Sequence, residues 1–242
     1  VDAFKQTDLY GAVPYIRQIY QLPAPLAPLL GHDLYIDLGG FVGHRKFNDI
    51  PFIDFVLHAF SIDPARVADD DKRTRLPFAP DPAHPVLKKI QSLKTRQRPL
   101  MLFHPQSSNM LRSMPPDAAL RLTAQLLEDT PFHLCSAVPV NIDHPRFTDL
   151  SSWSDSLSDL STIISAVDFI LTVDTCIYHL ADAFSIPTLA LFTSISPDYR
   201  TSYYPFVTGI QLPGASSEAF RNKHASNDHE YLEALNRSGL NL

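Results

Sequence analysis

The chain has 242 residues, of which 45% are hydrophobic and only 19% are charged, and its formal net charge is −6. This length allows a large core in one or two domains, and the acidic balance makes nucleic acids and anionic membranes poor default partners. With 8 glycines and 21 prolines, the chain contains none of the glycine-rich dinucleotide, P-loop or nucleophile-elbow motifs.

The two cysteines, Cys135 and Cys176, do not form a paired motif, and no signal-peptide pattern follows Val1. Because no apolar run is long enough to span a membrane either, we expect a cytoplasmic protein without a transmembrane segment. The ten histidines lack the spacing of zinc ligands, so we expect neither a metal nor a cofactor.

In chain order, the first third predicts a small α/β unit. Apolar residues at helical spacing predict a helix over 12–20, and 33–38 predict a strand that ends in a Gly-Gly turn. Residues 50–60 predict an apolar helix with a proline near its start. The proline-rich stretch 61–85 is typical of a linker or of a crossing between two lobes.

The second half predicts strands that alternate with helices. The predicted strands are 99–103, 132–137, 169–173 and 187–192. The predicted helices are 116–128, 156–167 and 178–184. The first of these helices is expected to turn Leu120, Ala124 and Leu127 inward, and the second begins at a capping pattern, Ser156 to Asp159.

Strands of this kind indicate a parallel sheet covered on both faces, because they lack the alternation of a strand with one wet face. Ligands of such sheets bind at the carboxyl ends of the strands. The loops after Phe103, Ala137, Val173 and Phe192 are therefore the places to search.

The loop after the third predicted strand is the most informative segment. The strand ends in Asp174-Thr175 and a helix begins at once, so unpaired N–H groups and the helix dipole suit a phosphate there. Alternatively, one of these two residues merely caps the helix. His179 could face the same cleft or be a hydrogen-bonded structural residue, and Cys176 is expected to pack rather than to act as a nucleophile.

Residues 174–192 read DTCIYHLADAFSIPTLALF, which resembles the signature of glycosyltransferase family 9, the ADP-heptose:lipopolysaccharide heptosyltransferases. The family pattern is D-[ST]-G-x-x-H-x-A-x-A-x-x-x-P, followed by an apolar strand and F-G. Residues 104–115 resemble the family's H-x-x-[ST]…K-x-W-P loop, and 33–40 resemble a strand of its amino-terminal lobe. The resemblance covers residues 33–206 and is strong over 99–192.

The resemblance implies a GT-B fold, in which two Rossmann-like lobes contain parallel sheets. We expect a shortened or incomplete acceptor-side lobe with its linker over residues 1–85, and a nucleotide-sugar-binding lobe over 86–242. The implied reaction is metal-independent transfer of a heptose, from a nucleotide-diphosphate donor such as ADP-heptose, with inversion. The acceptor would be a saccharide, lipid-linked or protein hydroxyl, which allows peripheral contact with a membrane.

The resemblance also implies donor-binding residues. Backbone amides at the helix start would hold the pyrophosphate, and two serine hydroxyls would donate hydrogen bonds to it. The donor-binding residues are then Ser107, Ser108, Asp174, Thr175, Cys176 and His179.

Two residues receive catalytic roles from the resemblance. Arg112 replaces the family's lysine and would neutralise charge on the leaving diphosphate, although a solvated surface arginine is the ordinary alternative. Asp8 would deprotonate the acceptor hydroxyl, or else it is a turn or capping aspartate.

The chain departs from the family pattern at several positions. Cys176 and Thr193 replace glycines, and Met114 replaces the tryptophan of the upstream loop. An alternative function therefore stays open: a non-catalytic nucleotide- or sugar-binding relative that acts as a subunit or interaction module.

Overall fold

The computed structural model describes residues 10–20, 23, 27, 30–36, 44–77, 79–95, 98–212, 229–230 and 233. Within them lies one six-stranded sheet of order β3-β2-β1-β4-β5-β6, in which every neighbouring pair is parallel. The strands are β1 (Leu100–His104), β2 (His133–Ser136), β3 (Phe147–Asp149), β4 (Phe169–Val173), β5 (Thr188–Phe192) and β6 (Val207–Gln211). The helices are α3 (Phe52–Ala59), α4 (Pro85–Leu93), α5 (Pro116–Asp129), α6 (Leu157–Ser165) and α7 (Cys176–Ala183).

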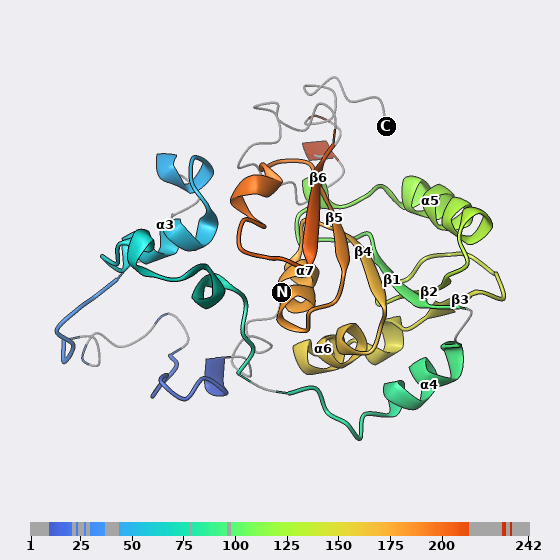
Figure 1. Cartoon of the computed structure of the whole chain (residues 1–242), viewed down its shortest axis with the longest axis horizontal. Coiled ribbons are helices and arrows are strands. Elements are labelled where there is room, and N and C mark those ends of the chain that lie inside the picture. The colour runs from blue at the N-terminus through green and yellow to red at the C-terminus, as the bar shows by residue number, and fades with distance from the viewer. Residues whose placement is uncertain are drawn as a thin grey trace.

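Helices cover both faces of the sheet, as Figure 1 shows. Leu100 and Leu102 of β1 pack against α4, α6 and α7 on one face, and the alternate residues Met101 and Phe103 pack against α5 on the other. All four side chains are buried, which is why these strands carry no polar alternation. The predicted α/β class with a doubly covered parallel sheet is confirmed.

The amino-terminal predictions are partly wrong. Helix α3 confirms the one expected over 50–60. The helix expected over 12–20 does not form, since only a short helical turn at residues 10–11 is present. Residues 33–36 are not a strand, and 37–38 lie outside the described residues. Tyr15 and Leu34 are exposed, and apolar spacing without a packing partner does not stabilise a short element.

The inward face of α5 also differs from the prediction. Its buried residues are Ala119, Thr123 and Leu127, one turn apart, and Leu120 is exposed. The Thr123 hydroxyl donates to the Ala119 carbonyl at 2.7 Å, so a polar residue fits on the buried face. The predicted capping pattern is confirmed, because Ser156 and Asp159 form a complete capping box at α6.

Residues 44–77 contact the carboxy-terminal part of the chain. Lys72 is buried, pairs with Asp54 at 3.0 Å, and donates to the Tyr203 hydroxyl at 3.0 Å. Further along, the Arg73 guanidinium lies 3.7 Å from the buried Asp182 of α7. The stretch expected to be a linker therefore holds α3 against the loops around β5, as Figure 1 shows.

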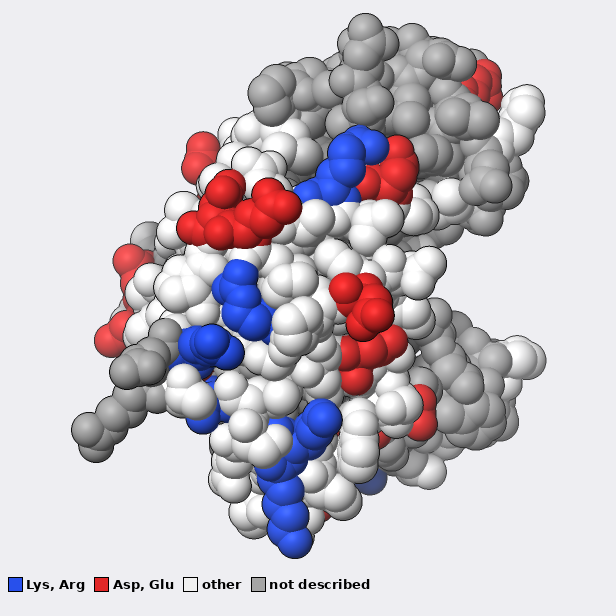
Figure 2. Space-filling view, turned by 90° about the vertical axis from the view of Figure 1, so that its right-hand side faces the viewer, with Lys and Arg blue, Asp and Glu red and all other residues white. Residues whose placement is uncertain are grey.

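The surface in Figure 2 carries Lys and Arg together with Asp and Glu, and neither sign forms a continuous stripe on this face. Oppositely charged side chains also pair on the surface, since Arg121 lies 3.0 Å from Asp117 on α5. Within the described part of the chain, none of the helices has both the length and the apolar character needed to cross a membrane.

Candidate functional site

Two loops meet at the carboxyl edge of the sheet, where β1 and β4 are neighbours. The loop after β1 contains the 3-10 helix η5 (Met110–Arg112), and Asp174 follows β4 directly. Arg112 Nη1 lies 3.5 Å from Asp174 Oδ2. Asp174 is buried, so the pair places one guanidinium and one carboxylate beside the start of α7.

The start of α7 carries no side-chain cap. Thr175 occupies the N-cap position with an extended backbone, yet no side chain accepts a hydrogen bond from the first turn. The Thr175 hydroxyl instead lies 3.9 Å from the Cys176 sulfur, and Asp174 faces Arg112 and Tyr178. Thr175 is therefore the N-cap residue by position but supplies no capping hydrogen bond, and the first N–H groups of α7 keep their capacity to bind an anion.

The loop after β1 brings two predicted serines to this edge. Ser108 is exposed, and its hydroxyl lies 3.4 Å from Arg112 Nη2. The backbone N–H of Ser107 donates to the Ser113 hydroxyl at 2.9 Å, whereas the Ser107 hydroxyl has no hydrogen-bond partner among the described residues. Beside this loop lies a pocket of about 240 Å³, lined by Ser107, Met110, Ser113 and Met114 among others.

Thr193, which replaces a glycine of the family pattern, supports the same loop. Its hydroxyl donates to the carbonyl of Leu111 at 2.6 Å, and Leu111 is the buried central residue of η5. A glycine could not make this bond. The residue that directly follows β5 therefore fixes the turn that carries Arg112.

His179 lies in the second turn of α7, and its Nδ1 is 2.8 Å from the Tyr204 hydroxyl. Burial lowers the pKa of His179 to about 4, and the positive charges of Arg200 and Arg112 act in the same direction. The ring is therefore neutral near pH 7 and adds no charge to the site. This contact matches the hydrogen-bonded structural alternative, and binding of a donor by His179 stays a prediction.

A second guanidinium, that of Arg200, also acts on this region. Arg200 follows the 3-10 helix η7 (Pro197–Tyr199) in the loop after β5. Burial lowers the pKa of Arg200 and the positive charge of Arg112 acts in the same direction, whereas Tyr178 and the carboxylate of Asp174 raise it. Arg200 thus stands in a loop at the same edge of the sheet as Arg112 and Asp174.

Sequence reasoning found part of this constellation. Five of the predicted residues, Ser108, Arg112, Asp174, Thr175 and Cys176, lie at or beside the start of α7. Cys176 is exposed rather than packed as expected. Desolvation by the neighbouring protein raises the pKa of its thiol, so the thiol is not an activated nucleophile. Asp8 lies outside the described residues.

Three residues with a place in the site were missed: Tyr178, Arg200 and Tyr204. The signal for Arg200 was available, because it stands in the loop after β5, one of the four loops at which a ligand is expected. Tyr178 is a buried residue of α7 that packs with Tyr204 in one apolar cluster, and nothing in their spacing distinguishes them from core residues.

The carboxy-terminal half carries a family match. Residues 155–229 match the model of glycosyltransferase family 9 (heptosyltransferase). The resemblance to glycosyltransferase family 9 is confirmed. The matched segment contains Asp174, α7 and the loop that carries Arg200, and it begins after Arg112. No curated protein matches the chain.

Several solved structures are similar to this chain. E. coli ADP-heptose lps heptosyltransferase II is 18% identical with a TM-score of 0.47, over 68% of this chain and 53% of that one. E. coli heptosyltransferase WaaC with ADP is 15% identical with a TM-score of 0.44, over 63% and 48%. The iron-containing dodecameric glycosyltransferase TibC of enterotoxigenic E. coli is 13% identical with a TM-score of 0.47, over 85% and 59%. The chain spans about half the length of these proteins.

Proposed function

We propose that this protein is a metal-independent, heptosyltransferase-like glycosyltransferase of GT-B type. Its donor would be a nucleotide-diphosphate sugar, ADP-heptose in the first place, bound at the carboxyl edge of the sheet. The sugar would pass to a hydroxyl of a saccharide or protein acceptor with inversion. The observation that carries the proposal is the position of Arg112, 3.5 Å from Asp174 beside the uncapped start of α7.

The chemistry of the leaving group supports this assignment. As the bond between the sugar and the diphosphate breaks, negative charge grows on the phosphate oxygens. Arg112 is only partly buried, so its guanidinium has room to bind those oxygens, and the amides of α7 would supply further hydrogen bonds. Charge-assisted bonds of this kind contribute about 1.5–3 kcal/mol each. A guanidinium and a helix start can therefore take the role that a metal ion has in other transferases.

The acceptor side of the reaction rests on a different residue. Inversion by direct displacement needs a base that removes the proton of the acceptor hydroxyl. The resemblance assigns that role to Asp8, which makes catalysis separable from donor binding by experiment.

The test is a calorimetric titration of the full chain with ADP, UDP, GDP and CDP, with and without magnesium. We expect ADP to bind selectively without magnesium, and we expect Arg112→Ala to lower the affinity for ADP by roughly 10- to 100-fold. Arg121→Ala is the matched control, because Arg121 is an exposed arginine in a pair with Asp117 on α5. Its affinity for ADP should equal that of the wild type.

The outcomes separate the candidate functions. If no nucleotide binds, or if Arg112→Ala binds ADP as well as the wild type does, the assignment of this edge of the sheet to the donor is wrong. If ADP binds and Asp8→Asn abolishes transfer from ADP-heptose while it leaves ADP affinity unchanged, the protein is an enzyme with Asp8 as its base. If ADP binds but the wild type transfers no sugar to any acceptor hydroxyl, the non-catalytic binding module is the better description.

A further inference from the structure

Arg200 is an arginine with unusually few polar contacts. Its guanidinium carbon lies 4.4 Å from the centre of the Phe47 ring and 5.4 Å from that of Phe52. Its Nη2 is buried and has no hydrogen-bond partner among the described residues, and Nη1 reaches only the Tyr199 carbonyl at 3.5 Å. Aromatic rings thus hold this cation in place, but they satisfy few of its five N–H groups.

The position of Arg200 connects it to the start of α7. The loop that contains Arg200 continues to Tyr204, whose hydroxyl lies 2.8 Å from His179 in the second turn of α7. On its other side, the guanidinium faces Phe52 of α3. In Figure 1 the segment after β5, drawn in orange, accordingly runs between α3 and the sheet.

The charges at this edge do not balance. Arg112 pairs with the carboxylate of Asp174. Arg200 stands in the loop after β5, at the same edge of the sheet, and forms no ion pair with any of the described residues. His179 is neutral near pH 7, so it adds no charge, and Arg200 remains a cation without an ion-pair partner in the loop that contacts α7 through Tyr204.

We propose that Arg200 supplies the second positive charge that complements the diphosphate of the donor, next to Arg112. This inference rests on the proposed function of the same site. A partly buried cation without an ion-pair partner is costly, and an anion with two or more negative charges offsets that cost for Arg112, Arg200 and the helix start together. A nucleoside without phosphates offers no such compensation.

A purely structural role for Arg200 would use the same contacts with Phe47 and Phe52. It would hold residues 44–59 against the loop after β5 and would affect stability alone. A readout that depends on phosphate therefore has to decide between the two roles.

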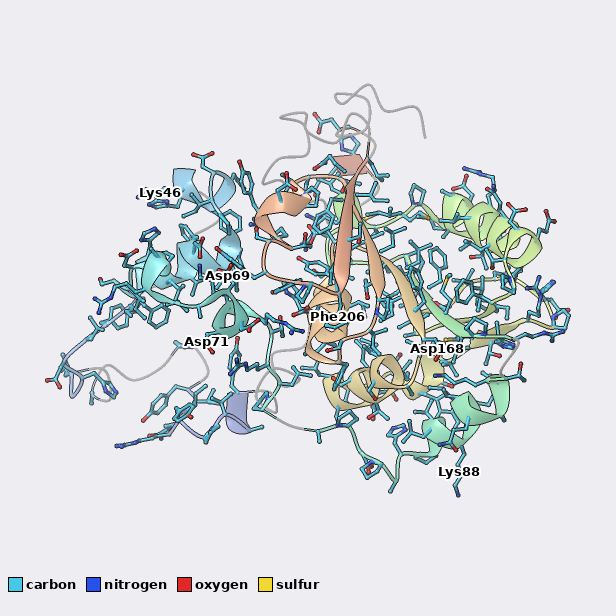
Figure 3. The ribbon with its side chains drawn as sticks, in the orientation of Figure 1. Lys46, Asp69, Asp71, Lys88, Asp168 and Phe206 are labelled. Atoms are coloured by element: carbon cyan, nitrogen blue, oxygen red, sulfur yellow. The ribbon has the colours of Figure 1, made fainter. Side chains whose placement is uncertain are left out.

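The experiment compares the affinities of ADP and adenosine for the full chain by calorimetry, with melting temperatures measured in parallel. Arg200→Gln should lower the affinity for ADP about tenfold or more and leave the affinity for adenosine unchanged. Arg200→Lys should retain part of the ADP affinity because it keeps the positive charge. Arg73→Gln is the matched control. Arg73 is also partly buried, lies 3.7 Å from a carboxylate of α7 and 5.4 Å from the Phe206 ring, labelled in Figure 3, but it contacts Asp182 at the other end of α7.

We expect Arg73→Gln to lower the melting temperature without a change in ADP affinity. The proposal is overturned if Arg200→Gln binds ADP with the affinity of the wild type, or if the substitution lowers the affinities for ADP and for adenosine to the same degree. Equal loss of ADP affinity in Arg200→Gln and Arg73→Gln would also overturn it. In each of these cases ADP binding by the wild type and its loss in Arg112→Ala keep the proposed function intact, whereas a wild type that binds no nucleotide removes both.

Discussion

Gly209 in the middle of β6 offers a sharp test of how the sheet positions the site. A Cβ at this position would lie 2.3 Å from Pro197 Cβ and 3.2 Å from Phe192 Cε2. Carbon atoms in contact are about 3.5–4.0 Å apart, so Gly209→Ala has to push Pro197 away by more than about 1 Å. Pro197 is buried, its ring cannot rotate out of the way, and it begins η7. The displacement therefore passes to Arg200, three residues further along the chain.

Forcing one extra carbon against the buried Pro197 costs about 1–3 kcal/mol. At about 2–4 °C per kcal/mol for a chain of this size, Gly209→Ala should lower the melting temperature by about 2–12 °C. The substitution should also lower the affinity for ADP, because the loop that carries Arg200 shifts. Gly11→Ala is the control, since no atom lies within 4 Å of a Cβ at that position, and its melting temperature should not fall. Thermal unfolding followed by circular dichroism gives the answer, and equal melting temperatures for Gly209→Ala and the wild type would refute the packing argument.

Two further predictions concern protonation and a single hydrogen bond. Burial lowers the pKa of both His104 and His179 to about 4 from the ordinary 6.5, so on acidification the unfolded chain takes up protons first. The free energy of unfolding should be highest above pH 6.5 and should fall toward pH 4, by about 1.4 kcal/mol per pH unit for each histidine. Urea unfolding from pH 7 to 4.5 measures this slope. If His179→Gln shows the same slope as the wild type, His179 does not have the lowered pKa. Thr193→Val removes the donor to the Leu111 carbonyl and should cost about 0.5–1.5 kcal/mol, measured in the same assay, whereas Thr193→Ser should retain most of that stability.

The sheet was predictable wherever both faces of an element are covered. β1 and β4 are short apolar runs with a polar residue at or directly after their end, His104 and Asp174. α6 begins at a capping box formed by Ser156 and Asp159. In these elements local preference and burial agree. β6 was missed because it is an edge strand in which Thr208 and Ile210 are exposed, so no buried run marks it. β3 has only three residues, none of them buried, which is too short for a pattern.

The helix expected over 12–20 and the strand expected over 33–38 failed for another reason. Their apolar residues have helical or strand spacing, but Tyr15, Ile16 and Leu34 are exposed rather than turned toward a core. The contacts that do order residues 44–77 are long-range ones, such as those of Lys72 with Asp54 and Tyr203. Pairs so far apart in sequence leave no periodic signal. The contact of Arg200 with the ring of Phe47 also joins residues far apart in the sequence, so it leaves no periodic signal either.

The departures from the family pattern can be weighed against this geometry. A glycine is required where the backbone adopts a positive φ, and among the described non-glycine residues only Ser61 and Ser185 do so. Cys176 begins α7 with an ordinary backbone, so its side chain does not strain the helix start. Thr193 makes a hydrogen bond to η5 that a glycine cannot make. Cys176 thus leaves the backbone at the start of α7 unstrained, and Thr193 supports the turn that carries Arg112, so neither substitution argues against the proposed donor site.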